Sequence, residues 1–353
     1  MPRGEGLAHR SHIPGPVTMS KDSILLLESV VGESIHMPDN GGLTADALVN
    51  HVKRSTNNEL VAEFISIDEE PKSATYLEAA KEENLYYRNR YYNVLSMDHS
   101  RVRINSGTYI NANFADGYKQ KNAYIAAQGP LDETFTDFWE MIWEQSVMTI
   151  AMATRLAGEG RFSSLCGEYW PRVDGQVDQY GEFEVRNKGI EKQKDLTVTA
   201  LVLQNLTTGE SRDIAHLQFT GWPDYDVPSS AAAFLSFLSR VRQSQLEAME
   251  RQTSGWTGHP LGPPILVHCS AGIGRTGTFC TVDISLQRLV DIGTVDITGT
   301  LQKLRSQRSL CIQTHQQYVF TYLAILEHCS REGLLKDKDS KAYVKRLCEN
   351  FRK

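Results

Sequence analysis

A cysteine followed by a glycine-containing turn and an arginine is the chemically richest segment of the sequence. Residues 265–277 read ILVHCSAGIGRTG, so an apolar run ends at His268 and Cys269, and Arg275 lies six residues after the cysteine. Glycines let backbone N–H groups turn inward without a Cβ clash, and such groups beside a helix N-terminus bind anions. Arginine adds a planar fork that grips two phosphate oxygens. The segment therefore predicts a phosphate site built around a cysteine.

The positive surroundings of that site favour the ionised form of Cys269, and a thiolate is an activated nucleophile. The alternative is an ordinary cysteine of the hydrophobic core. A second Cys-x5-Arg spacing, from Cys166 to Arg172, encloses GEYWP, which has bulky side chains, a proline, and no glycine next to the arginine. The spacing alone is therefore weak. The strand, the glycine turn and the following helix carry the prediction.

A cysteine nucleophile leaves a poor leaving group unprotonated, so the reaction also needs a general acid. Trp222-Pro223-Asp224 supplies a carboxylate in a turn between an expected strand and an expected helix. The proline restricts the local backbone, and the tryptophan can anchor a loop that moves. Asp224 is the candidate acid. Its alternative role is that of an ordinary turn or helix-start residue.

Hydrophobic patterning predicts the elements that position these residues. Strands are expected over residues 109–113, 123–127, 148–154, 183–186, 196–204, 213–219 and 264–268. Helices are expected over residues 135–143, from 229 onward, and over 275–290, 296–306 and 314–329, with 243–262 an exposed connection. Strands early and helices late predict an α/β or α+β fold with a mixed sheet.

Composition narrows the class of protein. The chain has 353 residues and a net charge of −6, which argues against general nucleic-acid binding. The apolar run at residues 24–27 is far too short to cross a bilayer, and the N-terminus has no secretory pattern. The six cysteines form no CxxC pair, so we expect reduced thiols in the cytoplasm, no metal site and no cofactor.

Taken together, these segments resemble the classical protein tyrosine phosphatases. Residues 268–277 are similar to the family's signature loop, 222–224 to its mobile acid loop, 88–91 (RNRY) to its phosphotyrosine-recognition loop, and 313–317 (QTHQQ) to its glutamine loop. Residues 109–112 and 128–131 match two further blocks, and the resemblance covers roughly residues 45 to 333 in family order. Within the family, the sequence is most similar to the non-receptor subtype that carries an N-terminal CRAL-TRIO lipid-binding domain. We expect that domain to be absent from these 353 residues.

The resemblance implies a fold and a division of roles. It implies a single phosphatase domain with a highly twisted mixed β-sheet flanked by helices. Cys269 would form a phosphocysteine, and Asp224 would act as general acid and then as base. The phosphoryl oxygens would be bound by Arg275 and the loop residues Ser270, Ala271, Gly272, Ile273 and Gly274.

The remaining matches imply supporting roles. Gln313 and Gln317 would position the hydrolytic water, and Thr276 would offer its hydroxyl to the leaving thiolate. His268 would support the geometry of the cysteine. Tyr91 would stack on the substrate ring and set a pocket depth that phosphoserine cannot span. Asn93 would contact the substrate backbone.

Several of these residues have simpler alternatives. Tyr91 lies among other tyrosines and could be a core residue. Gln317 could close a capping box that begins at Thr314, and Gln313 could be an ordinary surface residue. Arg305 and Arg308 could brace the loop, although Arg305 could instead reach a second anionic group on the substrate.

The sequence also departs from the family pattern. Asp226 stands where glycine is usual after the acid, which places a second carboxylate nearby. Leu165 replaces a lysine before Cys166, residues 160–164 form a lengthened stretch, and Glu159 is the candidate for the glutamate that braces the catalytic arginine. These departures motivate an alternative function, a phosphotyrosine-binding module with impaired turnover. A dual-specificity or lipid phosphatase is disfavoured by the 88–91 segment.

The expected organisation has three parts: an N-terminal extension at 1–43 that is largely disordered, a catalytic domain at 44–333, and a charged tail at 334–353. Phosphotyrosine-containing proteins are the expected partners. A monomer is the default oligomeric state.

Overall fold

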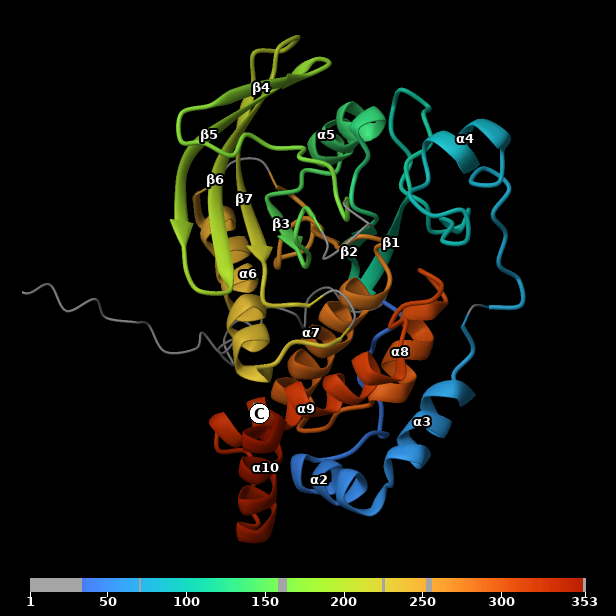
Figure 1. The fold of residues 1–353 in the computed structure, drawn as a ribbon, viewed down its shortest axis with the longest axis vertical. Helices are drawn as coiled ribbons and strands as arrows, with labels where there is room; N and C mark the ends of the chain where they lie inside the picture. The colour runs from blue at the N-terminus through green and yellow to red at the C-terminus, as the bar shows by residue number, and fades with distance from the viewer. Residues whose placement is uncertain (1–33, 70, 158–163, 224–225, 252–255, 352–353) are drawn as a thin grey trace, which may run out of the picture.

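A mixed β-sheet forms the centre of the computed structural model, which describes residues 34–69, 71–157, 164–223, 226–251 and 256–351 (Figure 1). Within these ranges the sheet has eight strands in the order β1-β2-β8-β3-β7-β6-β5-β4. The strands are β1 (Ala112–Gly117), β2 (Gln120–Ala127), β3 (Thr149–Met152), β4 (Val177–Tyr180), β5 (Phe183–Lys192), β6 (Leu196–Asn205), β7 (Ser211–Phe219) and β8 (Ile265–His268).

The middle of this sheet is parallel and its two ends are antiparallel. Strand β8 pairs in parallel with β2 and β3, and β3 pairs in parallel with β7. The remaining pairs, β1 with β2 and the β4–β7 meander, are antiparallel. The expected mixed sheet is therefore confirmed. The parallel centre also brings the carboxyl ends of β2, β8, β3 and β7 to one edge, where ligands bind in open α/β sheets.

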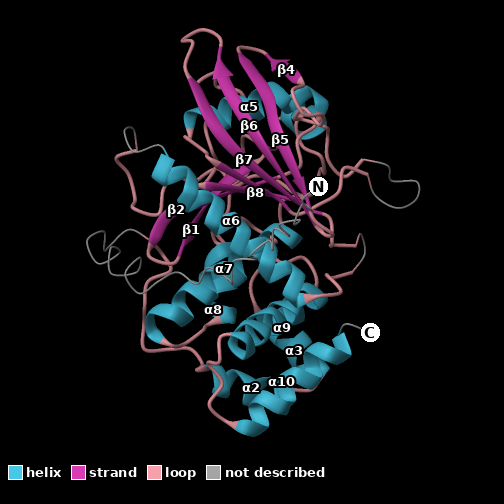
Figure 2. Ribbon diagram, turned by 90° about the vertical axis from the view of Figure 1, so that its left-hand side faces the viewer, coloured by secondary structure: helices cyan, strands magenta, loops and turns pink. Residues whose placement is uncertain are grey.

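Helices cover both faces of the sheet and bury two hydrophobic clusters. One face packs against α6 (Ala231–Arg251), α7 (Gly274–Ile292), α8 (Ile297–Arg305) and α9 (His315–Arg331). The other face packs against α5 (Phe135–Glu144), which follows the short 3₁₀ helix η2 (Asp132–Thr134), and against Tyr169 and Trp170. The predicted apolar face of α5 is confirmed, because Phe138, Trp139 and Ile142 are buried. Figure 2 shows the meander at one end of the molecule and α7–α9 towards the other.

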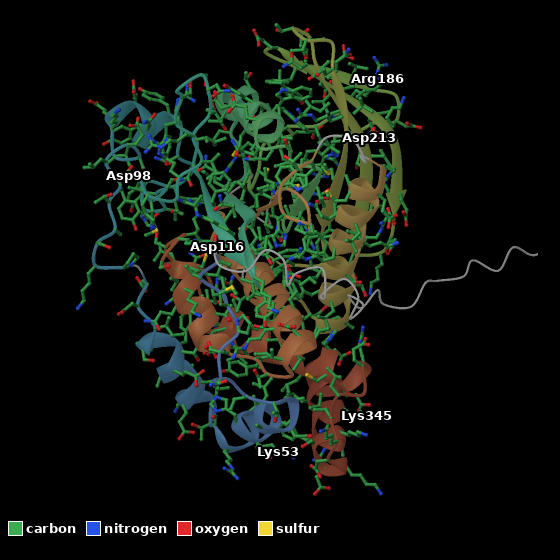
Figure 3. The ribbon with its side chains drawn as sticks, turned by 180° about the vertical axis from the view of Figure 1, so that it is seen from behind. Lys53, Asp98, Asp116, Arg186, Asp213 and Lys345 are labelled. Carbon is green, nitrogen blue, oxygen red and sulfur yellow. The ribbon has the colours of Figure 1, made fainter. Side chains whose placement is uncertain are left out.

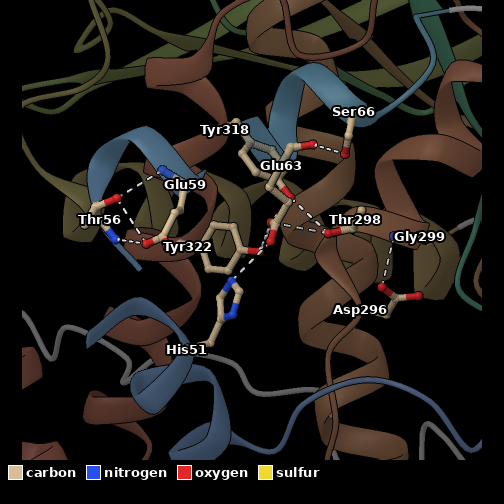
Figure 4. Close-up of polar contacts among 10 residues, drawn as sticks. All are labelled: His51, Thr56, Glu59, Glu63, Ser66, Asp296, Thr298, Gly299, Tyr318 and Tyr322. Atoms are coloured by element: carbon tan, nitrogen blue, oxygen red, sulfur yellow. Dashed lines mark hydrogen bonds and ion pairs between the residues drawn. The ribbon is translucent and has the colours of Figure 1, made fainter. Parts of the chain in front are cut away.

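Two N-terminal helices, α2 (Ala45–Arg54) and α3 (Asn57–Ser66), dock on α9 through a polar cluster (Figure 4). Glu63 Oε1 accepts hydrogen bonds from the hydroxyls of Tyr318 at 2.5 Å and Tyr322 at 2.6 Å. The His51 ring stacks on Tyr322, and its Nε2 lies 3.2 Å from Glu63 Oε2. A capping box between Thr56 and Glu59 begins α3.

One expectation from the sequence needs correction, and the structure adds detail to two others. Residues 243–251 are not an exposed connection, because α6 continues to Arg251 and buries polar side chains such as Gln245, which donates to Pro263 O. The expected charged tail contains helix α10 (Lys338–Phe351), which packs on α9 and α2. The buried face of α10 is narrow and includes Val344 and Cys348, which are four residues apart. In the sequence these two residues stand among charged residues, so the helical pattern is weak.

Residues 34–43 of the expected disordered extension are also ordered against the domain. Asp116, labelled in Figure 3, accepts from Ile35 N at 3.0 Å, and Ser34 donates to Gly117 O at 2.7 Å. Residues 1–33 lie outside the described residues. The domain boundaries at 44 and 333 stay a prediction.

Helix α4 (Glu82–Tyr87) precedes the expected recognition loop.

None of the helices in the described ranges combines the length and apolar character that crossing a membrane requires.

Candidate active site

Each backbone carbonyl in the turn between β8 and α7 accepts a hydrogen bond. Within residues 269–273 the bonds run from His268 Nδ1 to Cys269 O (3.1 Å), Gly129 N to Ser270 O (2.8 Å), Arg308 Nη2 to Ala271 O (3.1 Å), Arg308 Nε to Gly272 O (3.2 Å), and Gly277 N and Ile312 N to Ile273 O (2.8 and 3.2 Å). A trans peptide is planar with its C=O and N–H opposed, so each tied carbonyl directs the following N–H to the other side.

One of these N–H groups is bound to the cysteine sulfur. Gly272 N donates to Cys269 Sγ at 3.2 Å. The amides of Ser270, Ala271 and Ile273 have no protein acceptor within the part of the chain that the structure describes. Buried N–H groups require acceptors, and a helix N-terminus adds positive potential. This geometry supports the predicted anion cradle, which stays a prediction.

Arg308 is the main brace of this cradle from outside. It is fully buried and also donates from Nη1 to the side-chain oxygens of Asn111 (2.7 Å) and Asn113 (2.8 Å). Arg305, in contrast, binds Cys311 O, Ile312 O and Ile67 O. Arg305 is buried, so it acts as a brace in the next loop and does not face a second anionic group.

Arg275 lies at the start of α7 and links the cradle to two neighbouring loops. Its Nη1 donates to Thr154 Oγ1 at 2.9 Å, and its Nη2 donates to Pro223 O at 3.1 Å. The sequence analysis missed Thr154. It could have been found, because Thr154 follows β3, the parallel neighbour of β8, and so reaches the same edge of the sheet.

The segment with the candidate acid is anchored by a buried tryptophan. Trp222 packs edge-on against Phe234 with ring centroids 5.7 Å apart, and its Nε1 donates to Asp226 O at 2.8 Å. Asp224 itself lies outside the described residues, as do Glu159 and residues 160–163 of the lengthened stretch. Asp226 is exposed and is not among the residues with positive φ, so it carries no left-handed strain.

The recognition segment reaches the cradle through Arg90. Its guanidinium donates to Gly129 O (2.8 Å), Pro130 O (2.9 Å) and Ser164 O (3.1 Å), the last directly before Leu165. Tyr91, the next residue, lies at the edge of the Cys269 turn, which we call the rim. Its hydroxyl is 2.9 Å from Ser270 Oγ, and 38% of its surface is exposed. Its tyrosine neighbours at 86, 87 and 92 are 68–77% exposed, so core packing does not explain this cluster. Asn93 is exposed on the same segment.

The glutamine segment lies on the other side of the turn. Gln317 is buried, packs against Gly274, and accepts at Oε1 from Gln313 N at 2.9 Å. The Gln317 side chain therefore binds the backbone N–H of Gln313 and not that of Thr314. The expected capping box is only half formed, because the Thr314 side chain accepts from Gln317 N but the reciprocal bond is replaced. Gln313 is exposed, and the hydroxyl of Thr276 is buried without a hydrogen-bond partner in the described structure.

A chain of polar groups extends from the cysteine away from the cradle. Tyr169 OH lies 2.6 Å from His268 Nε2 and 2.8 Å from His216 Nε2. Burial lowers the pKa of His268 to about 4, so the ring is neutral at pH 7. Because Cys269 O can only accept, His268 carries its proton on Nδ1, and Tyr169 donates to Nε2. No periodic pattern in the sequence pointed to Tyr169 and His216.

Four of the other five thiols are in a different environment. Burial raises the pKa of Cys311 and of Cys329 to about 12, and it raises the pKa of Cys166 and Cys280 as well. These four thiols are therefore protonated at neutral pH. Of these cysteines and Cys269, Cys269 is the one whose sulfur accepts from a backbone N–H of the cradle.

Comparison with known sequences agrees with this geometry. A sequence model described as protein-tyrosine phosphatase matches residues 86–327. The chain belongs to the protein-tyrosine phosphatase family. Two curated relatives, both named tyrosine-protein phosphatase non-receptor type 9, are 42% (Rattus norvegicus) and 41% (Homo sapiens) identical over 309 residues, which is 86% of this chain and 52% of each relative.

More distant members are also similar. Receptor-type tyrosine-protein phosphatase S of Gallus gallus is 41% identical over 283 residues, which is 78% of this chain and 17% of that protein. The chain thus spans about half the length of the non-receptor relatives. The expected resemblance to a non-receptor phosphatase catalytic domain is confirmed.

Gly272→Ala tests the cradle. Gly272 has φ +72°, and a Cβ there would lie 2.2 Å from Ala127 O. We expect a loss of unfolding free energy of about 3 kcal/mol or more, measured by urea denaturation, because backbone must shift. Gly175→Ala is the matched control, since Gly175 has φ +78° with nothing within 4 Å. It should cost only about 1–2 kcal/mol. Equal losses would contradict the close approach at Gly272.

The neutral state of His268 predicts a pH dependence of stability. The pKa of His268 is about 4 in the folded protein and roughly 6.5 in an unfolded chain. Between these values only the unfolded state binds the proton, so the free energy of unfolding should fall as pH falls from about 6.5 to 4. Ring ¹⁵N shifts at pH 5.5 should report neutral His268 with a protonated Nδ1. An imidazolium signal there would contradict the assignment.

Proposed function

We propose that the protein hydrolyses phosphotyrosine in other proteins through a phosphocysteine on Cys269. The observation that carries the proposal is the turn at residues 269–273, whose five carbonyls are tied by hydrogen bonds and whose Gly272 N donates to Cys269 Sγ at 3.2 Å, which favours a ring of inward N–H groups. Such a ring compensates the three peripheral oxygens of a phosphoryl group while the sulfur faces phosphorus. Membership of the family supports the same reaction class.

The proposed reaction has two displacement steps. The Cys269 thiolate attacks phosphorus, the bond from phosphorus to the phenolic oxygen breaks, and Asp224 gives its proton to that oxygen. Water then attacks the phosphocysteine, Asp224 takes a proton from it, and the sulfur leaves as a thiolate. Gln313 and Gln317 position the water, and Thr276 stabilises the departing sulfur.

Charge stabilisation in both steps is assigned to Arg275 and the loop amides. The guanidinium binds two phosphoryl oxygens as a planar fork, and its bonds to Thr154 and Pro223 fix its orientation beforehand. His268 remains neutral and holds the Cys269 carbonyl away from the cradle.

Substrate selection is assigned to the rim. Tyr91 stacks on the phosphotyrosine ring, and the depth it adds keeps the shorter phosphoserine from reaching Cys269. Asn93 contacts the peptide backbone beside the phosphotyrosine. Phosphotyrosine-containing proteins are therefore the proposed partners.

A binding module with impaired turnover is the second candidate. Asp226 and Leu165 favour it. Both depart from the family pattern, and both lie next to segments that would close over a bound substrate. The two candidates differ in rate but not in phosphotyrosine binding.

Hydrolysis of a phosphotyrosine peptide separates the two candidates. The wild-type chain should release phosphate, and Cys269→Ser should reduce kcat to background because the hydroxyl is not ionised at neutral pH. Cys348→Ser, on helix α10, is the control and should keep the wild-type rate. A phosphoserine peptide of the same sequence should not be hydrolysed. A wild-type rate no higher than that of Cys269→Ser would favour the binding module.

Asp224→Ala tests the general acid. We expect kcat to fall by about 10²–10⁴, with binding of the phosphotyrosine peptide retained, because the acid acts on the leaving group and not on the ground state. Asp226→Ala is the matched control two residues later and should change kcat much less. A loss of affinity with an unchanged kcat would assign Asp224 to binding.

A further inference from the structure

A group of exposed aromatic side chains flanks Tyr91, the residue at the rim. Twelve large apolar side chains are exposed in the described structure, and five of them fall within residues 77–92. Tyr86, Tyr87 and Tyr92 are 68%, 70% and 77% exposed, and within the described ranges they make neither a hydrogen bond nor a ring contact. We call these three residues the tyrosine surface. Gathered apolar area without a partner marks an interaction site on a folded domain.

The backbone beneath the tyrosine surface is held by two buried amide side chains. Gln128 donates from Nε2 to Arg88 O and accepts at Oε1 from Arg90 N, both at 2.8 Å, so it clamps the segment that follows α4. Asn89 donates from Nδ2 to Asn84 O at 3.0 Å, which ties the same segment back to α4. A tyrosine has only two side-chain torsions, so a ring on a fixed backbone contacts a partner at a low cost in conformational entropy.

The three cations nearest to the tyrosine surface in the sequence each have a partner within the domain. Lys81 Nζ lies 2.9 Å from Glu78 Oε2. Arg88 pairs with Asp137, and the Arg90 guanidinium donates to three backbone carbonyls. The segment therefore presents aromatic rings, and not free positive charge, to a peptide bound beside it.

Two carboxylates on α4 have no such partner. Glu82 and Glu83 are exposed and form no ion pair within the described residues. They precede Tyr86 and Tyr87 by four residues, and side chains four apart share one face of a helix. Negative potential beside the rings disfavours an acidic residue of a partner. Rings and charge together fit a bulky apolar side chain.

We propose that the tyrosine surface binds a bulky apolar side chain that flanks the phosphotyrosine of a substrate, an inference that rests on the proposed function. The rim connects the two sites, because the Tyr91 hydroxyl lies 2.9 Å from Ser270 Oγ and Tyr92 is the next residue. An extended peptide advances about 3.3 Å per residue, so side chains a few positions from the phosphotyrosine lie outside the rim. A flanking ring stacks there on the exposed tyrosines.

Peptide affinity tests the tyrosine surface without requiring turnover. Three phosphotyrosine peptides differ only in their flanking residues, which are phenylalanines, alanines or glutamates. In fluorescence anisotropy titrations, the full chain with Cys269→Ser should bind the phenylalanine peptide about tenfold more tightly than the alanine peptide, and the glutamate peptide most weakly. With the wild-type chain the same order should appear in KM, since a flanking contact is equal in the ground state and the transition state.

Substitutions in the Cys269→Ser chain assign the preference to the rings. Tyr92→Ala and Tyr87→Ala should each reduce the tenfold preference to about threefold, whereas Tyr92→Phe should keep it, because the Tyr92 hydroxyl has no partner in the described structure. Leu206→Ala is the control. Leu206 is 44% exposed in the turn between β6 and β7, at the opposite end of β7 from the sheet edge near Cys269, so the preference should be unchanged.

Three outcomes overturn the proposal. Phenylalanine and alanine peptides could bind equally, or the preference could survive in both alanine variants. An unphosphorylated phenylalanine peptide could also bind as tightly as the phosphorylated one, which would assign the tyrosine surface to a partner other than the substrate. A preference in binding without phosphate release by the wild-type chain would instead contradict the proposed function and support the tyrosine surface. If no phosphopeptide binds, both proposals fail.

Discussion

The opposition of C=O and N–H in each planar peptide is the constraint on which the active site depends. Five consecutive carbonyls, those of residues 269–273, accept hydrogen bonds, so the N–H groups that follow them face away from those bonds, and one of them, Gly272 N, donates to Cys269 Sγ. The conformation of the turn is thus imposed largely by residues outside it. Arg308 contributes most, because one buried guanidinium holds two adjacent carbonyls and two asparagine side chains.

The sheet explains why such distant residues meet. Strand β8 lies between β2 and β3, with both pairings parallel, so the residues after each strand emerge at one edge. Gly129 reaches the Ser270 carbonyl after β2, and Thr154 reaches Arg275 after β3. Arg90 then ties the recognition segment to Gly129. A mixed sheet with a parallel centre therefore brings residues 90, 129, 154, 270 and 275 to one edge.

The sequence predicted those parts of the site whose local pattern is strong. The glycine turn between an apolar run and a helix predicted where the turn around Cys269 lies. The helical period of residues 135–143 predicted α5, and the β-rich runs predicted most strands of the sheet. Tyr169 and His216 could not be found in this way, because their pairing with His268 depends on strand order. Helix α10 and the end of α6 were missed, since polar side chains such as Gln245 are buried by tertiary contacts that outweigh composition.

Ile312 connects the sheet edge that holds the Cys269 turn with helix α3. A β-branched residue with φ +56° costs about 1–3 kcal/mol, so its conformation persists only where surrounding bonds impose it. Those bonds come from Ile312 N to Ile273 O and from Arg305, which also binds Ile67 O and lies over the Phe64 ring of α3. The docking of α3 and the placement of Gln313 are consequently coupled equilibria. A force or ligand that lifts α3 from the domain would release the backbone beside Gln313 and would also loosen the bond from Ile312 N to the Ile273 carbonyl.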